Sequence, residues 1–336
     1  MIRAWAQKTR YGFRTLALAV LAAIAAGGCA PREKADDGQI RIGAIVFQED
    51  QYFRLVEFGM RDAAAKAGAA ISVNNSFNAL DKEISLIDTY LANRVDALVV
   101  APLSAQSSIS ALKRAAGRGI PVVVFDSFVE ADFPASTVRS DQVELGRVTG
   151  EFARAFIEEQ LGGKAKIAIV QFIAHMPEPG SQRVQGFRDE VTKLPGVEIV
   201  TAQDAWLAPE ATALVENILT ANPDIDIVWS ANEGGTVGSV NAARAANMKN
   251  PARHVYVFGT DMSEQIGAFL LSSDNVLQAV TGQKPFDIGA LAVNNALKAI
   301  NGDPVEKRVA MPGMLFSRTD PDGVNAYLAM LKELTQ

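Results

Sequence analysis

Short runs of apolar residues alternate along the chain with segments in which apolar residues recur every three or four positions. The runs contain no polar residue, as expected for strands that are buried on both faces of a parallel sheet. The intervening segments, such as the one with Ile84, Ile87 and Leu91, have the period of an amphipathic helix. This alternation predicts an α/β fold. The clearest apolar runs are Ile42–Phe47, Leu98–Ala101, Val122–Phe125 and Ile167–Val170.

The predicted elements divide into two halves that repeat the same order of strands and helices. Each strand–helix–strand unit is expected to make a right-handed crossover, so we expect two lobes, each with a parallel sheet flanked by helices. The first half has strands at Arg41–Phe47, Ala70–Asn74, Ala97–Ala101 and Pro121–Asp126, and helices at Phe53–Ala67, Asp81–Asn93 and Ser107–Gly117. The second half has strands at Lys166–Phe172, Val197–Ala202, Ile227–Ala231 and His254–Asp261, and helices at Arg183–Lys193, Pro209–Asn222 and Gly235–Asn247.

The N-terminus has the layout of an export signal. Basic residues precede the apolar stretch Leu16–Ala26, which is shorter than the roughly 20 residues of a membrane-spanning helix. The small residues before Cys29 resemble a bacterial lipobox, in which the cysteine is lipidated and becomes the first mature residue. We therefore expect a lipoprotein signal peptide at 1–29 and a polar tether at 30–38. Ordinary cleavage nearby, for example after Ala30, is the alternative.

Composition narrows the functional classes. Cys29 is the only cysteine, so neither a disulfide nor a multi-cysteine metal site is expected. The net charge is −6 and the basic residues are scattered, which argues against a nucleic-acid-binding face. No cofactor or metal is expected from any motif, because neither the G-x-G-x-x-G pattern nor the Walker pattern occurs.

Carboxylates, amides and aromatic residues follow the ends of the predicted strands. In open α/β sheets, ligands bind beyond the carboxyl ends of the strands. Carboxylates and amides hydrogen-bond hydroxyl groups, and aromatic faces cover the apolar C–H face of a sugar ring. This mixture predicts a site for a small polyhydroxylated molecule. The segments after the strands are Gln48–Phe53, Pro102–Ser104, Asp126–Phe128, Ile173–Met176, Asp204–Trp206, Asn232–Gly235 and Asp261–Ser263.

Several motifs occur in one order from about Arg41 to the C-terminus. They are Glu49-Asp50-Gln51-Tyr52-Phe53, Val122-Val-Val-Phe-Asp126, Arg183-Val-Gln-Gly-Phe187, Trp206, Asn232-Glu233, Gly259-Thr-Asp261 and Gln283. In these residues the chain resembles the ribose/galactose-type periplasmic sugar-binding proteins, which are the substrate-binding components of sugar ABC importers. The resemblance implies a type I periplasmic-binding-protein fold, in which two α/β lobes are joined by a three-segment hinge.

The resemblance also implies lobe limits and ligand residues. The N-terminal lobe is expected at 39–140 plus 284–312 and the C-terminal lobe at 141–283 plus 313–336, with hinge segments near Arg139–Asp141, Gly282–Pro285 and Met311–Gly313. Of Tyr52 and Phe53, one is expected in the core and either can be the stacking ring. The implied ligand-binding residues are Glu49, Asp50, Tyr52, Phe53, Asp126, Ser127, Arg183, Trp206, Asn232, Asp261 and Gln283, with Gln48, His175 and Glu233 as further contacts.

Two positions depart from the ribose-specific pattern. Ser127 stands where ribose-specific members carry arginine, and Asp50 stands where they carry asparagine. Both changes lower the positive charge of the first lobe. They indicate a neutral monosaccharide or polyol rather than an anionic ligand, and they argue against ribose itself.

The function predicted on this basis is that of a monomeric solute-binding protein. It would work in the periplasm or at the cell surface, anchored through Cys29 or soluble, and deliver its ligand to an ABC permease in the inner membrane. The alternative is a periplasmic sensor that presents a sugar-like signal to a chemoreceptor or a two-component receptor. An enzyme is not expected, because no Gly-x-Ser-x-Gly elbow and no cluster of metal ligands is found.

Overall fold

The computed structural model describes residues 38–104, 106–127 and 129–335. All helices and strands below belong to a compact unit that begins at Ile40. The predicted lipoprotein signal, with Cys29, and the predicted tether up to residue 37 lie outside the described residues.

The first sheet is entirely parallel. Its strands are β1 (Arg41–Val46), β2 (Ala70–Asn75), β3 (Ala97–Val100), β4 (Val122–Phe125), β5 (Ser136–Ser140) and β11 (Arg308–Met311). They lie in the order β11-β5-β4-β3-β1-β2, with every neighbouring pair parallel. We call this sheet and its helices the first lobe. The helices are α2 (Gln51–Lys66), α3 (Leu80–Ala92), α4 (Ile109–Gly117) and α10 (Pro285–Asn301).

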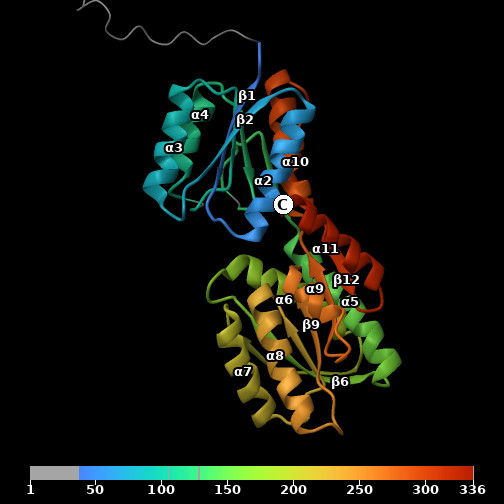
Figure 1. Cartoon of the computed structure of the whole chain (residues 1–336). Coiled ribbons are helices and arrows are strands. Elements are labelled where there is room, and N and C mark those ends of the chain that lie inside the picture. Colours follow the sequence, from blue (N-terminus) through green and yellow to red (C-terminus); the bar gives the residue numbers. More distant parts are fainter. Residues whose placement is uncertain (1–37, 105, 128, 336) are drawn as a thin grey trace, which may run out of the picture. The chain divides into compact units, whose positions relative to one another are not determined.

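Helices cover both faces of the first sheet. On one face α2 and α10 lie side by side, and α3 and α4 cover the other face (Figure 1). The two helices of the first pair approach closely because glycines face each other's backbone. A Cβ atom added to Gly59 would lie 1.9 Å from the carbonyl oxygen of Phe286, and one on Gly289 would lie 2.0 Å from that of Val56. Any larger residue at either position would force these helices apart.

The second sheet has one antiparallel strand. Its strands are β6 (Lys164–Gln171), β7 (Gly196–Asp204), β8 (Ile227–Ser230), β9 (Tyr256–Thr260), β10 (Leu277–Gly282) and β12 (Met314–Ser317). They lie in the order β12-β10-β9-β8-β6-β7, and β12 is antiparallel to β10. The sheet is otherwise parallel, as predicted, and β12 was not among the predicted strands. Only Pro312 and Gly313 separate β12 from β11 of the first lobe. The direction of β12 is therefore set by the direction in which β11 leaves the first sheet.

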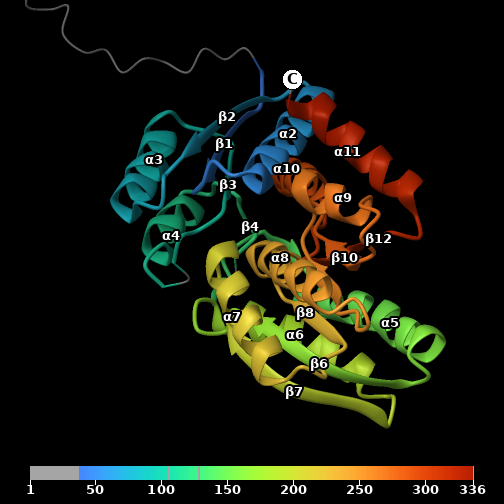
Figure 2. The same ribbon diagram turned by 60° about the horizontal axis from the view of Figure 1, so that its bottom comes forward.

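We call this sheet and its helices the second lobe. In both views α7 and α8 lie side by side along it (Figures 1 and 2). The helices of the lobe are α5 (Gln142–Gln160), α6 (Pro177–Val191), α7 (Ala208–Ala221), α8 (Glu233–Lys249), α9 (Glu264–Leu270) and α11 (Pro321–Thr335).

Helix α6 begins six residues before its predicted start at Arg183. Pro177 is its first residue, and Pro179 also lies in its first turn. Proline is tolerated there because the first turn of a helix does not use its N–H groups for helical hydrogen bonds. As a consequence Arg183 lies in the second turn and is only 6% exposed. The prediction placed it at the helix start.

Trp229 lies fully buried in the core of the second lobe. Its ring stacks on Phe187 of α6, with ring centroids 4.4 Å apart and planes 10° from parallel. The prediction that Trp229 is a core residue is confirmed. The core that α8, α9 and α11 form with the second sheet also includes Leu55 of α2, so the first lobe contributes to it.

The chain passes between the two sheets after β5, after β10 and after β11. The first passage follows Ser140 and leads into α5. The second follows Gly282 and leads through Gln283 into α10, which packs against α2. The predicted residue limits of the two lobes stay predictions.

Candidate functional site

Asp126 and Asp261 lie at equivalent points of the two sheets. Asp126 follows β4 and Asp261 follows β9. Each has a left-handed backbone, with φ values of 62° and 70°. Aspartate adopts this conformation more readily than most residues that have a Cβ atom. In each case the backbone N–H continues the sheet: Asp126 donates to Val138 of β5 at 3.0 Å and Asp261 donates to Thr281 of β10 at 2.9 Å. Both carboxylates are therefore placed just beyond strand ends.

In the first lobe, Tyr52 of α2 is the hydrogen-bond partner of Asp126. Its hydroxyl donates to Oδ1 at 2.8 Å. Burial raises the pKa of Asp126, and the hydrogen bond from Tyr52 lowers it in part. Burial also raises the pKa of Tyr52 well above its ordinary value. Phe53 is 4% exposed and packs edge-on against Phe47 at 4.5 Å. Of the two aromatic residues, Phe53 is thus the core residue and Tyr52 reaches the strand end.

In the second lobe, Arg183 is the partner of Asp261. Its Nη1 donates to the carbonyl oxygen of Ala231 at 2.8 Å and to Oδ2 of Asp261 at 3.4 Å. The guanidinium also lies 5.3 Å from the centre of the Phe172 ring. Oδ2 of Asp261 accepts a further bond, from the backbone N–H of Glu233 at 3.1 Å. The buried arginine and the aspartate therefore form a charged pair held on several sides.

The charges of the second lobe act on the carboxylate of the first. Burial is the main cause that raises the pKa of Asp126, while the positive charge of Arg183 lowers it and the negative charges of Asp50 and Asp261 raise it. Arg183 and Asp261 also shift the pKa of Tyr52. The charged groups of the second lobe therefore influence the titration of the two first-lobe residues.

Gln283 links Asp261 to the end of β5. Its Nε2 donates to Oδ1 of Asp261 at 2.9 Å, and its Oε1 accepts from the hydroxyl of Ser140 at 2.7 Å. Gln142 contacts the other member of the pair, since its Oε1 accepts from Nε of Arg183 at 2.7 Å. Neither Ser140 nor Gln142 was predicted as a site residue. The signal for both was their position in or beside the predicted hinge segment Arg139–Asp141.

Trp206 and His175 form an aromatic surface in the second lobe. Their rings stack at 5.7 Å, and Trp206 also meets Phe172 edge-on at 5.3 Å. Trp206 is half-buried and His175 is exposed, so the indole is partly accessible. The loop is held by Asn232, whose Nδ2 donates to the carbonyl oxygen of Trp206 at 2.9 Å.

Asn232 and Asp50 both cap helices. Oδ1 of Asn232 accepts from the N–H of Gly235 at 3.1 Å at the start of α8, and Asp50 accepts from the N–H of Phe53 at 2.9 Å at the start of α2. Since both ends of the Asn232 amide have partners in the protein, its capacity for a ligand is reduced. A direct contact from either residue stays a prediction.

The remaining predicted contacts lie around these clusters. Partial loss of solvent raises the pKa of Glu233, its hydrogen bond with Ser263 lowers it, and the charges of Asp261 and Asp50 raise it further. Glu49 is exposed, and Gln48 and Ser127 are half-buried. The hydrogen bonds thus form two groups: Tyr52 with Asp126 in the first lobe, and Arg183 with Asp261 and Gln283 in the second.

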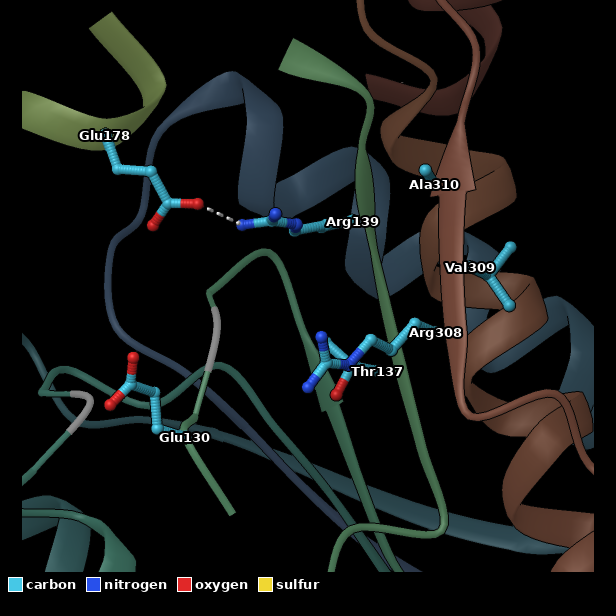
Figure 3. A pocket seen from close by; sticks show the side chains of 7 residues that line it. All are labelled: Glu130, Thr137, Arg139, Glu178, Arg308, Val309 and Ala310. Carbon is cyan, nitrogen blue, oxygen red and sulfur yellow. Dashed lines mark hydrogen bonds and ion pairs between the residues drawn. The ribbon is translucent and has the colours of Figure 1, made fainter. Parts of the chain in front are cut away.

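A separate hollow of about 350 Å³ lies along β5 and β11 (Figure 3). An ion pair across it joins Nη1 of Arg139 on β5 to Oε1 of Glu178 on α6 at 3.2 Å. None of the predicted ligand residues lines it, so it is distinct from the strand-end clusters. Its lining residues are Glu130, Thr137, Arg139, Glu178, Arg308, Val309 and Ala310.

Neither a cluster of metal ligands nor a membrane-spanning helix occurs among the described residues. In the part of the chain that the structure covers, no group of three or more His, Cys, Asp or Glu side chains has an arrangement that could hold a metal ion. Among the same residues, no helix has both the length and the apolar character needed to cross a membrane.

Known proteins resemble this chain over most of its length. The "ABC transporter periplasmic-binding protein YphF" of Escherichia coli (strain K12) is 28% identical over 301 residues, which is 87% of this chain and 90% of the relative. The "Ribose import binding protein RbsB" of Bacillus subtilis (strain 168) is 27% identical over 288 residues, 84% of this chain and 88% of the relative. An ABC transporter solute-binding protein from Bacillus halodurans, solved with bound myo-inositol, has the same fold: the TM-score is 0.71 at 23% identity, with 88% of this chain and 99% of that chain covered.

A family model extends across both sheets. The model described as "Periplasmic binding protein domain" matches residues 44–304, from β1 to the residues after α10. The match and the two-sheet architecture confirm the predicted fold class. The chain belongs to the periplasmic binding protein family.

Proposed function

We propose that this protein binds a small, neutral polyhydroxylated molecule, a monosaccharide or a polyol, and delivers it to the permease of an ABC importer. The match to the family and the names of the relatives support this, since one relative is named for ribose import and a solved structure of the same fold contains myo-inositol. We propose binding without turnover, in the periplasm, with the protein anchored through Cys29.

The observation that carries the proposal is the pair of strand-end carboxylates, Asp126 and Asp261, one from each lobe. Ionised carboxylates only accept hydrogen bonds, and the hydroxyl groups of a sugar can donate to them. The indole of Trp206, which is partly exposed, offers apolar surface to the C–H groups of a ring. Acceptors on two sides and an aromatic wall together suit a polyol better than an apolar ligand.

Charge supports a neutral ligand. Arg183 is the positively charged partner of Asp261. Its Nε and Nη1 already donate to Gln142, Ala231 and Asp261. Ser127, beside Asp126, brings no positive charge. An anionic ligand would meet the carboxylates of Asp126 and Asp261 with little positive charge left to offset them.

The proposed mechanism is closure of the two lobes around the ligand. The chain crosses between the sheets after β5, β10 and β11, and we propose that these crossings serve as the hinge. A ligand that contacts Asp126 and Asp261 at once binds the closed state more tightly than the open one. It shifts the equilibrium only by that difference in affinity.

Thermal unfolding with a ligand panel tests the proposal. The domain from about Gln39 onward would be unfolded in the presence of pentoses, hexoses, alditols, inositols and nucleosides. A ligand present at about 100 times its Kd adds roughly 2.7 kcal/mol to the free energy of unfolding, which raises the midpoint by several degrees. The same ligand should give no shift with an Asp126→Ala/Asp261→Ala double variant. Absence of any shift across the panel would count against sugar or polyol binding.

A further inference from the structure

Both glutamines that touch the Arg183–Asp261 pair come from the crossings between the lobes. Gln142 is the first residue of α5, directly after the crossing that follows β5. Gln283 comes directly after β10, at the start of the next crossing. Gln142 accepts a hydrogen bond from Nε of Arg183 at 2.7 Å, and Gln283 donates to Asp261 at 2.9 Å. Each of these two crossings therefore holds one member of the charged pair.

Ser140 connects the two glutamines and closes a ring of hydrogen bonds. Its hydroxyl donates to Oε1 of Gln283 at 2.7 Å. Its carbonyl oxygen accepts a longer bond, of 3.5 Å, from Nε2 of Gln142. The ring thus runs from Ser140 through Gln283, Asp261, Arg183 and Gln142 back to Ser140.

The ring determines how the guanidinium of Arg183 is oriented. A guanidinium is planar, so two fixed nitrogens fix the plane of the whole group. Gln142 holds Nε, while Ala231 and Asp261 hold Nη1. In the part of the chain that the structure describes, Nη2 has no hydrogen-bond partner, which leaves it as the donor of Arg183 for another molecule.

We infer that Gln142 is a positioning residue of the ligand site: it holds the plane of Arg183 so that Nη2 is available to a ligand, without contacting the ligand itself. Both ends of its amide are engaged, Oε1 by Arg183 and Nε2 by Ser140. This inference rests on the proposed function for its consequence in sugar binding. The orientation of Arg183 does not depend on that function and can be tested without a ligand.

The ring also couples the crossings to the site. Ser140 ends β5, and Gln142 lies only two residues further along the same segment. A change of backbone torsion between them moves the partners of Arg183 and of Gln283 together. If the lobes close as proposed, a torsion change at this crossing would alter the contacts of the Arg183–Asp261 pair through these few residues.

Solvent exchange of the Arg183 Nε–H proton is the first test. Its NMR signal in the ligand-free protein would be assigned by its loss in Arg183→Lys.

Gln142→Leu removes the acceptor with little change in size, whereas Gln142→Glu keeps an acceptor at the same place. We expect exchange to be about tenfold or more faster in Gln142→Leu, as a lost hydrogen bond to a charged group implies, and close to wild type in Gln142→Glu. Gln160→Leu, at the other end of α5, is the control. Equal exchange in Gln142→Leu and wild type would overturn the inference.

Binding of D-ribose and of myo-inositol is the second test. Gln142→Leu should weaken the binding of whichever probe binds by about tenfold or more, and Gln142→Glu should restore most of it. In an Arg183→Lys background Gln142→Leu should cause no further loss, because it acts through the arginine. An equal loss in both backgrounds would overturn the positioning role. If neither probe binds wild type, the compound that gives the largest shift in the unfolding panel replaces them, while the exchange rates already decide whether Gln142 positions Arg183.

Discussion

Asp126 and Asp261 are related as counterparts in the two lobes: each follows a parallel strand, each has a left-handed backbone, and each donates its N–H to the next strand of its sheet. A left-handed non-glycine residue costs on the order of 1–3 kcal/mol and is found where the surrounding structure enforces it, often at functional sites. The same local geometry, used twice, places one carboxylate just beyond a strand end of each sheet.

Loss of the second-lobe carboxylate should abolish most of the affinity. Asp261→Ala removes an acceptor of Arg183, Gln283 and the N–H of Glu233, and it removes the proposed acceptor of ligand hydroxyls. We expect binding of the sugar or polyol identified by the panel to weaken by about 2 kcal/mol or more, which is roughly thirtyfold, when measured by calorimetry.

The matched control for this variant is Asp274→Ala. Asp274 also pairs with an arginine, Arg244, and has a similar exposure, but it lies in the loop before β10 rather than after a strand end. It should leave the affinity unchanged. Equal affinity of wild type and Asp261→Ala would remove Asp261 from the site.

The first-lobe carboxylate should make the ligand-free protein less stable as the pH rises. Burial raises the pKa of Asp126, so the folded state keeps a proton at pH values at which the unfolded chain has released it. The stability that this proton contributes is fully present below the unfolded pKa of about 3.9 and is lost as the pH rises through the folded pKa. Asp126→Asn should therefore raise the unfolding midpoint at neutral pH while it weakens ligand binding.

The pH dependence of this difference is the check. Below about pH 3.9 the midpoints of wild type and Asp126→Asn should converge, because the aspartate is then protonated in both states. A midpoint difference that is the same at about pH 3.5 and at about pH 7 would show that ionisation of Asp126 is not its cause.

Removal of the Tyr52 hydroxyl should raise the pKa of Asp126 further. The hydrogen bond from Tyr52 at 2.8 Å is the strongest influence that lowers it. Tyr52→Phe should also lower the free energy of unfolding by about 1–3 kcal/mol, since a buried acceptor loses its donor. Titration of the Asp126 carboxyl carbon by NMR measures the pKa. Tyr256→Phe, in the second lobe beside Phe156, serves as the control, and an unchanged Asp126 pKa in Tyr52→Phe would contradict the account.

The two tryptophans of the folded domain should report on different events. Trp206 is half-buried beside His175, whereas Trp229 is fully buried against Phe187. Ligand-induced changes of tryptophan fluorescence should be lost in Trp206→Phe and kept in Trp229→Phe. Trp229→Phe should instead lower the free energy of unfolding by about 1–3 kcal/mol, through lost packing. A fluorescence response that survives in Trp206→Phe would place the ligand away from Trp206.

The architecture was predictable because its signals are local. Runs such as Val122–Phe125 have no polar position and therefore predict buried parallel strands, and the structure confirms the fold class with boundaries that shift by a few residues. The start of α6 was missed because Pro177 and Pro179 are typical of loops, although the first turn of a helix accepts both. The direction of β12 was missed because it depends on a strand of the other lobe.

The geometry of the site was less accessible to sequence reasoning. Tyr52 and Phe53 are neighbours of the same kind, and only the packing of Phe53 against Phe47 assigns it to the core. Gln142 carries no motif, and its contact with Arg183 spans 41 positions of the chain. Contacts of this kind depend on where three crossings bring separate segments together, which no local pattern encodes.

The most direct test of the account is a calorimetric titration with the compound that gives the largest shift in the unfolding panel. We predict binding at one site per chain in wild type, and no measurable heat of binding in the Asp126→Asn/Asp261→Asn double variant at the same concentrations. Both asparagines keep the left-handed backbone accessible, so the variant should fold. Undiminished binding by the folded double variant would contradict the claim that these two strand-end carboxylates hold the ligand.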